Sequence, residues 1–118
     1  MTKTMVYTVP CADNEVSEND LLEQDGAGAM KLFDGTGSAI GVAETDKDSE
    51  DNVAMVTRGL KKVKVGVRQT WDVGDKLGVN STGVVTYSSG TVIGVAAETH
   101  ATALATSGML LADLNITN

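Results

Sequence analysis

One short phrase occurs twice in this chain, and it limits the possible folds more than any other feature of the sequence. Ile40-Gly41-Val42-Ala43 returns 53 positions later as Ile93-Gly94-Val95-Ala96. The pair that follows, Glu44-Thr45, has its counterpart in Glu98-Thr99, with the register displaced by one residue. A repeat of about 50 residues is marginal alone, so each copy has to bury apolar surface against the other. The sequence therefore predicts one domain made of two copies of a single unit.

The residue types favour short strands joined by glycine turns. Thirteen glycines accompany one proline, aromatic residues make up 3% of the chain, and valine, threonine and isoleucine are prominent. We expect an all-β fold, a small barrel or sandwich, with a single β domain over residues 16–118. Its pseudo-repeated halves would cover about residues 16–68 and 69–118, after an extended N-terminal arm formed by residues 1–15.

Alternating apolar residues and turn signals divide the domain into strands. In residues 60–68 valines alternate with basic residues, the period-two pattern of a sheet with one wet face. We expect Arg58-Gly59 to separate this strand from Val53–Thr57, and residues 98–107 to form a loop. Residues 17–24 fit a capped helix or, more readily, a turn that enters a strand. The other expected strands are Met30–Phe33, Ser38–Ala43, Lys76–Val79, Val84–Tyr87, Thr91–Ala97 and Gly108–Ile116.

The net charge of −7 is distributed unevenly along the chain. Residues 1–52 hold twelve acids and three bases, a net charge of −9, whereas residues 53–118 hold four acids and six bases, a net charge of +2. A stretch without acids contains the basic strip, which we define as Lys61, Lys62, Lys64 and Arg68. This strip fits an acidic partner, the acidic arm of a neighbouring copy, or a solvated strand face. The acidic chain as a whole lacks the charge and motifs of a protein that binds nucleic acid directly.

The chain has few of the residues that catalysis or metal binding requires. His100 is the single histidine and Cys11 the single cysteine, so a catalytic triad has no clear basis and a zinc cage cannot form. Acids alternate in residues 46–50 as calcium ligands do, but Asp51 stands where an EF-hand loop needs glycine. We therefore expect no enzyme activity, no catalytic or metal-binding residue and no cofactor.

Cysteine use and hydropathy bear on the compartment. One cysteine excludes an internal disulfide, and the sequence contains no run of 18 apolar residues that would span a bilayer. No apolar signal-peptide segment follows the first residues. We expect synthesis in a reducing compartment and no contact with a membrane.

Lys61 and Lys62 leave one alternative function open. Lipoyl and biotinyl carrier domains are also small, acidic β-sandwiches with two similar halves, and these lysines lie between the halves expected here. A carrier presents its lysine at the tip of a tight hairpin, whereas Lys61 and Lys62 enter an alternating strand after Gly59. A small carrier or ligand-binding module is therefore the second interpretation.

Two stretches carry patterns of a known kind. In the first, Leu32-Phe33-Asp34-Gly35-Thr36 places an aromatic-Asp-Gly-Thr turn before the apolar strand Ala39–Ala43. In the second, Val73-Gly74-Asp75-Lys76-Leu77 is followed by Gly83–Thr86 and Ile93–Ala96. The first stretch resembles the hairpin of lambda-type head decoration proteins, and the second resembles the short cement proteins of tailed bacteriophages.

This resemblance implies a β-tulip-like protein, commonly trimeric, that sits on the outer surface of the phage head and stabilises the expanded shell. Its partners would be the major capsid protein and further copies of itself. It would be made in the host cytoplasm and end on the exterior of the virion. Contacts to shell subunits or to neighbouring copies are expected from the apolar arm and the basic strip, that is from Met5, Tyr7, Val9, Lys61, Lys62, Lys64 and Arg68.

Overall fold

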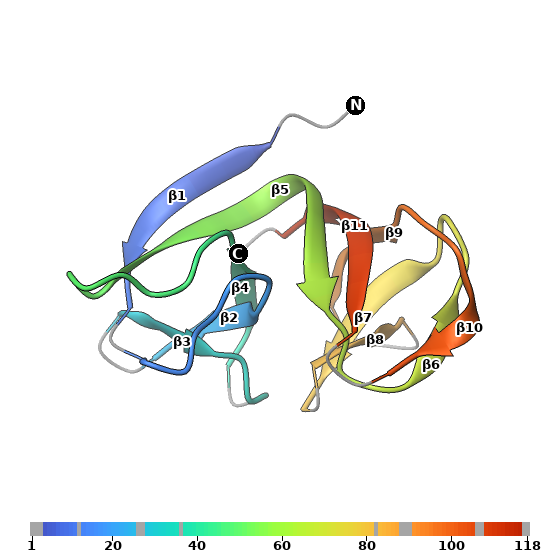
Figure 1. The fold of residues 1–118 in the computed structure, drawn as a ribbon, viewed down its shortest axis with the longest axis horizontal. Helices are drawn as coiled ribbons and strands as arrows, with labels where there is room; N and C mark the ends of the chain where they lie inside the picture. The colour runs from blue at the N-terminus through green and yellow to red at the C-terminus, as the bar shows by residue number, and fades with distance from the viewer. Residues whose placement is uncertain are drawn as a thin grey trace.

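The computed structural model describes residues 4–11, 13–25, 28–35, 37–81, 83–87, 91–105 and 108–116. These residues form eleven strands and no helix, which confirms the all-β prediction (Figure 1). No helix long and apolar enough to cross a membrane occurs among them. The strands are β1 (Met5–Pro10), β2 (Leu21–Gln24), β3 (Met30–Leu32), β4 (Ala39–Ala43), β5 (Asn52–Lys64), β6 (Gln69–Trp71), β7 (Lys76–Asn80), β8 (Gly83–Thr86), β9 (Val92–Ala96), β10 (His100–Leu104) and β11 (Met109–Asn115).

Most of the strands belong to one curled sheet with a regular order. Its path runs β3-β2-β4-β5-β11-β9-β7-β8, and β1 pairs with β5 outside this path. The order is similar from both ends of the path. A hairpin of two short strands (β3 and β2, or β8 and β7) is followed by the strand with the repeated phrase (β4 or β9) and then by a longer strand (β5 or β11). In Figure 1 the long strand β5 arches over the molecule, with β2 to β4 under one end and the later strands under the other. Strands β6 and β10 form a separate ribbon.

The two halves contain the same turn before their second strand. Asn19 donates its backbone N–H to the carbonyl of Ala43 at 2.8 Å, and Gly74 donates to the carbonyl of Ala96 at 2.8 Å. Both residues have a positive φ, 75° for Asn19 and 92° for Gly74. Asparagine tolerates this region better than most residues other than glycine, so different sequences form the same turn. The interpretation of residues 17–24 as a turn entering a strand is therefore confirmed.

The two strands expected on either side of Arg58-Gly59 form a single strand, β5, which ends at Lys64. The expected turn was wrong because hydrogen-bonded partners continue through this point. β1 pairs with residues 52–58 and β11 pairs with residues 58–64. Gly59 has a φ of 102°, and a Cβ there would lie 2.7 Å from the Cα of Thr4. The glycine therefore serves the close approach of a neighbouring chain segment.

A second difference concerns residues 98–107, where the sequence predicts a loop and the structure contains β10. This strand pairs with β6 through His100↔Trp71 and Leu104↔Gln69. Both strands are short and have no clear period-two alternation, so their sequences carry no strand signal. Trp71, the last residue of β6, is 1% exposed and packs in the core, so it anchors this ribbon to the rest of the domain.

The core consists of two clusters of buried apolar side chains. One belongs to the first half and contains Cys11, Val16, Leu22, Met30, Ala43, Val53 and Met55. The larger cluster lies mainly in the second half, in strands β5 to β11 and their connections. It also includes four buried residues that precede Arg58, which are Leu21, Ala39, Val42 and Val56. One face of the first half therefore packs into the core of the second half.

Candidate functional site

Strand β1 leaves apolar side chains in solvent on both of its faces. Met5, Val6 and Tyr7 are 38%, 50% and 45% exposed. Because successive side chains of a strand point to opposite faces, neither face of this end of β1 is covered. Among the described strands, β1 pairs with β5 alone, so its other edge keeps unpaired backbone groups. These features suit a strand that docks against another chain.

The far end of β1 is anchored in the core of the first half. Val9 packs against the cluster that contains Cys11, and Cys11 itself is 1% exposed. Burial raises the pKa of the Cys11 thiol, which keeps the thiol protonated and poorly reactive. The predicted arm residues thus divide into two displayed side chains, Met5 and Tyr7, and one packing side chain, Val9. Val6 is exposed as well, although the sequence prediction named only the alternate residues Met5, Tyr7 and Val9.

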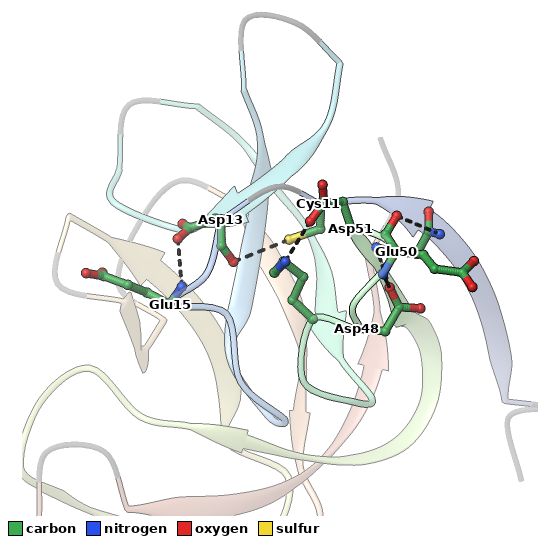
Figure 2. A network of polar contacts seen from close by, with 8 residues as sticks. Cys11, Asp13, Glu15, Asp48, Glu50 and Asp51 are labelled. Atoms are coloured by element: carbon green, nitrogen blue, oxygen red, sulfur yellow. Dashed lines mark hydrogen bonds and ion pairs between the residues drawn. The ribbon is translucent and has the colours of Figure 1, made fainter.

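The acidic loop, residues 44–51, holds this anchor in place (Figure 2). The backbone carbonyl of Asp51 accepts the N–H of Cys11 at 2.8 Å, and the Asp51 carboxylate pairs with Lys47 at 2.6 Å. Asp48 Oδ1 accepts two backbone N–H groups that follow it, at 2.8 and 2.9 Å. These carboxylates therefore order their own loop. Within the described ranges, no group of three or more His, Cys, Asp or Glu side chains is arranged to hold a metal ion.

Two lysines of the basic strip connect β5 to segments that precede it in the chain. Lys61 is 8% exposed, and its Nζ lies 3.7 Å from Glu44 Oε1. Lys64 donates its backbone N–H to the carbonyl of Asn19 at 3.0 Å, and its Nζ lies 2.9 Å from Asp20 Oδ1. Glu44 is 42% exposed and Lys64 is 29% exposed, so both pairs are only partly buried and each contributes modestly to stability. Lys61 and Lys64 therefore hold β5 against earlier segments, and the sequence did not indicate this because their partners lie far away along the chain.

The exposed cations of the strip are Lys62 and Arg68. Lys62 Nζ lies 3.9 Å from Glu98 Oε2, a solvent-exposed pair that contributes little to stability. The predicted residues do not gather into one site, because β1 pairs with the first part of β5 and the strip begins on the second part. Arg58, between the two, is also exposed.

Glu98 Oε2 is the acceptor at which three contacts meet. His100 Nε2 lies 3.0 Å away, the backbone N–H of Leu111 donates at 2.7 Å, and Lys62 lies nearby. The contact with His100, followed by that with Leu111, lowers the pKa of the Glu98 carboxyl. Because the pKa is lower in the folded state, the stabilisation is complete above the ordinary pKa of about 4.3 and disappears as the pH falls through the folded pKa.

Glu98→Gln should therefore lower the free energy of unfolding by about 1 kcal/mol at pH 7. The difference from the unsubstituted chain should shrink as the pH falls below about 4.3, because both chains then carry a neutral side chain. Urea unfolding between pH 3 and 7 measures it. Glu50→Gln, at an exposed acid, is the control and should change little. A difference that does not depend on pH would contradict this role of Glu98.

A surface groove of about 430 Å³ lies on the second half. Its lining residues are Arg58, Lys76, Val92, Gly94, Val95, Asp113 and Asn115. Val92 and Val95 are 37% and 36% exposed, so the groove combines apolar side chains with two cations and one acid. Sequence reasoning missed this groove. The available signal was Val95, which belongs to the repeated phrase although its counterpart, Val42, is fully buried.

The lysines that suggested a carrier domain do not occupy a carrier position. Lys61 and Lys62 lie inside the 13-residue strand β5, away from any hairpin tip. Lys61 is also buried and paired with Glu44. A lysine that carries a swinging cofactor needs an exposed turn, and neither residue has one.

The fold has a counterpart among solved structures. The head fibre gp8.5 N base of bacteriophage phi29 is similar with a TM-score of 0.57 and 19% sequence identity. The similarity covers 96% of this chain and 95% of that chain. At this identity the likeness shows the fold alone. No curated protein matches the chain.

The sequence also matches the family model described as phage cement protein, over residues 2–111. The match spans β1, both copies of the repeated phrase and most of the groove. It confirms the resemblance drawn from the hairpin and strand motifs. The chain therefore belongs to the phage cement proteins, and it is a structural component of the virion that binds the capsid and decorates the phage head.

Proposed function

We propose that this cement protein binds the outer surface of the head as a homotrimer, through the major capsid protein, and stabilises the expanded shell. The observation that carries the proposal is β1, an apolar strand with two open faces and one unpaired edge. Such a strand is stabilised by a partner that covers it. Weak contacts repeated over a lattice then add up to tight binding without a large interface for each copy.

We propose no catalytic role for the chain. His100, the residue that a hydrolase would need, lies 3.0 Å from Glu98 Oε2, and the Cys11 thiol is buried with a raised pKa. A protein with one buried thiol is suited to synthesis in the reducing host cytoplasm. The net charge of −7 supports a protein partner over nucleic acid.

We keep residues 1–15 as the contact arm and residues 16–118 as the β domain. The arm supplies apolar area, and the exposed part of the basic strip supplies charge. The proposed contact residues for shell subunits or neighbouring copies are Met5, Tyr7, Lys62 and Arg68, with Val9, Lys61 and Lys64 holding them in place.

Deleting residues 2–8 tests the proposal. This deletion keeps Val9 and Cys11, which belong to the core, and removes the exposed apolar side chains. We expect at least tenfold weaker binding to expanded heads, because each copy loses its docking strand. The number of bound copies per head, counted by electron microscopy across a concentration series, measures the effect.

Two further variants separate lost contacts from lost folding. Met5→Ser combined with Tyr7→Ser keeps the backbone of β1 and should also weaken binding. Val73→Ser, at a side chain that is 65% exposed in a turn of the second half, should bind normally. Thermal unfolding by circular dichroism confirms that each variant is folded. If both arm variants bind expanded heads as tightly as the unsubstituted chain, the arm does not contact the head.

A further inference from the structure

The two ends of an internal repeat offer complementary surfaces. We infer that β1 of one copy docks in the groove on the second half of the next copy, so that copies associate head to tail. This inference rests on the proposed self-association and names the surfaces that carry it. It starts from the correspondence between the two halves of the chain.

Strand β1 corresponds to the second part of β5. Cys11 makes an isolated parallel bridge with Met30, and Val65, 54 residues later, makes an isolated parallel bridge with Val84. Cys11 also follows β1 directly, as Val65 directly follows β5. Both residues donate their backbone N–H to the segment before the long partner strand, Cys11 to Asp51 at 2.8 Å and Val65 to Gly108 at 3.0 Å. This correspondence gives units whose bounds differ from the halves expected from the sequence, because the first unit begins with β1 and ends near Arg58, and the second begins near Gly59.

Corresponding positions differ in exposure on one face only. Val6 and Leu60 are both exposed, at 50% and 44%. On the opposite face Tyr7 is 45% exposed, whereas its counterpart Lys61 is 8% exposed. Lys61 pairs with Glu44 of the first unit, across the contact between the halves. The face of β1 that carries Tyr7 thus lacks the neighbour that covers the same face of β5.

The groove is the surface that can supply this neighbour. The four residues of the first unit that join the core of the second unit have counterparts at the same register positions in β7, β9 and β11. Leu21 pairs with Val42 and Val42 with Val56, just as Lys76 pairs with Val95 and Val95 with Asp113. All four counterparts line the groove, and they are Lys76, Val92, Val95 and Asp113. The groove is therefore the face of the second unit that matches the face by which the first unit packs against the second. Within the described part of the chain, no third unit covers it.

Two observations identify the occupant as a second copy of this chain. Each end of the chain offers one side of the contact that joins the two units, since β1 is uncovered at one end and the groove is uncovered at the other. The overall charges of the two regions are opposite, −9 for residues 1–52 and +2 for residues 53–118, whereas β1 itself carries no charged side chain. The contact is therefore mainly apolar, with Val92 and Val95 facing it from a groove that also contains Arg58, Lys76 and Asp113. A contact between two different surfaces is heterologous, and it forms a ring where the rotation between copies closes. The homotrimer proposed above would be such a ring.

Cross-linking of cysteine variants tests this geometry. Glu44 and Ala97 occupy matching positions, because their backbone N–H groups bond to the carbonyls of Ala54 and Leu111 at 2.7 and 2.9 Å. The pairing of Lys61 with Glu44 within the chain therefore predicts that Tyr7 lies near Ala97 of the next copy. Tyr7→Cys protein refolded together with Ala97→Cys protein should form linked dimers with a short bismaleimide. Each variant alone should give none, and the double variant should give linked trimers.

Controls and a second measurement keep the test decisive. Val73→Cys in place of Ala97→Cys should give no linked dimer, and the native Cys11 is 1% exposed. Val95→Glu, which places an acid in the groove, should weaken self-association at least tenfold in sedimentation, whereas Val73→Glu should not. Links formed by Tyr7→Cys alone, or a monomeric native chain, would overturn the inference. If copies bind expanded heads but form no such links, the head-to-tail inference fails and the proposed binding to heads stands. If linked rings form but do not bind heads, the proposed binding to heads fails and the inference stands.

Discussion

Replacing Trp71 with alanine is expected to lower the free energy of unfolding by about 3–5 kcal/mol. Trp71 is the largest fully buried side chain among the described residues, and its side chain is 1% exposed. It packs in the larger core cluster, which also joins the two halves. Since small domains are stable by about 5–15 kcal/mol, this loss should leave the variant close to unfolding. Urea unfolding followed by circular dichroism measures the loss. Tryptophan fluorescence is unsuitable because the substitution removes the single tryptophan.

Trp71→Phe is the matched control and should lose less than about 1.5 kcal/mol. Within the described ranges, the buried indole Nε1 of Trp71 has no hydrogen-bond partner. Leaving such a donor unpaired costs about 1–3 kcal/mol, and phenylalanine avoids this while filling much of the space. Equal losses in the alanine and phenylalanine variants would mean that the indole N–H contributes a bond of its own.

Gly94→Ala is expected to lower the free energy of unfolding by about 3 kcal/mol. A Cβ at this position would lie 2.4 Å from the carbonyl oxygen of Asp113 and 3.0 Å from the Cα of Leu114. Both atoms belong to the backbone of β11, which pairs with β9 at this point. The methyl group fits only if the two strands separate, so ladder hydrogen bonds weaken. The midpoint of thermal or urea unfolding measures the loss.

Gly41→Ala is the corresponding substitution in the first copy of the repeated phrase. Its nearest contacts would be Met55 Cγ at 2.4 Å and Met55 Sδ at 2.6 Å, with the carbonyl oxygen of Val56 at 3.0 Å. The flexible methionine side chain can move aside, so we expect a loss of about 1 kcal/mol. A larger loss for Gly41→Ala than for Gly94→Ala would contradict the register described for β9 and β11.

Several features of the molecule follow from the sequence alone. The repeated phrase lies in β4 and β9, and each of these strands is flanked by a short strand and a long strand. Asp34-Gly35 indicated a turn, and Gly35 has a φ of 90°. The hairpin predicted at this turn was wrong, because β3 and β4 each pair with β2, which lies between them. Strand periodicity, glycine turns and the motifs shared with cement proteins are local properties. They depend on the conformations that a few neighbouring residues can adopt.

The contact surfaces were only partly accessible from the sequence. The alternation in the arm singled out Met5 and Tyr7, which are exposed, but it did not reveal that Val6 on the opposite face is exposed as well. The basic strip was identified as a run of charge, whereas Lys61 is buried against Glu44. Exposure depends on which distant segments cover a strand, and a local pattern does not contain that information.

The sequence by itself determined the all-β class, the phrase that occurs twice, the separation of charge between residues 1–52 and 53–118, and the family resemblance. Tertiary structure alone decided that β5 runs unbroken through Gly59, that β6 pairs with β10, and that the second half carries an open groove. The physical reason is that turns and strands are set by neighbouring residues. Ion pairs, buried faces and grooves are set by the register between strands that lie far apart in the chain.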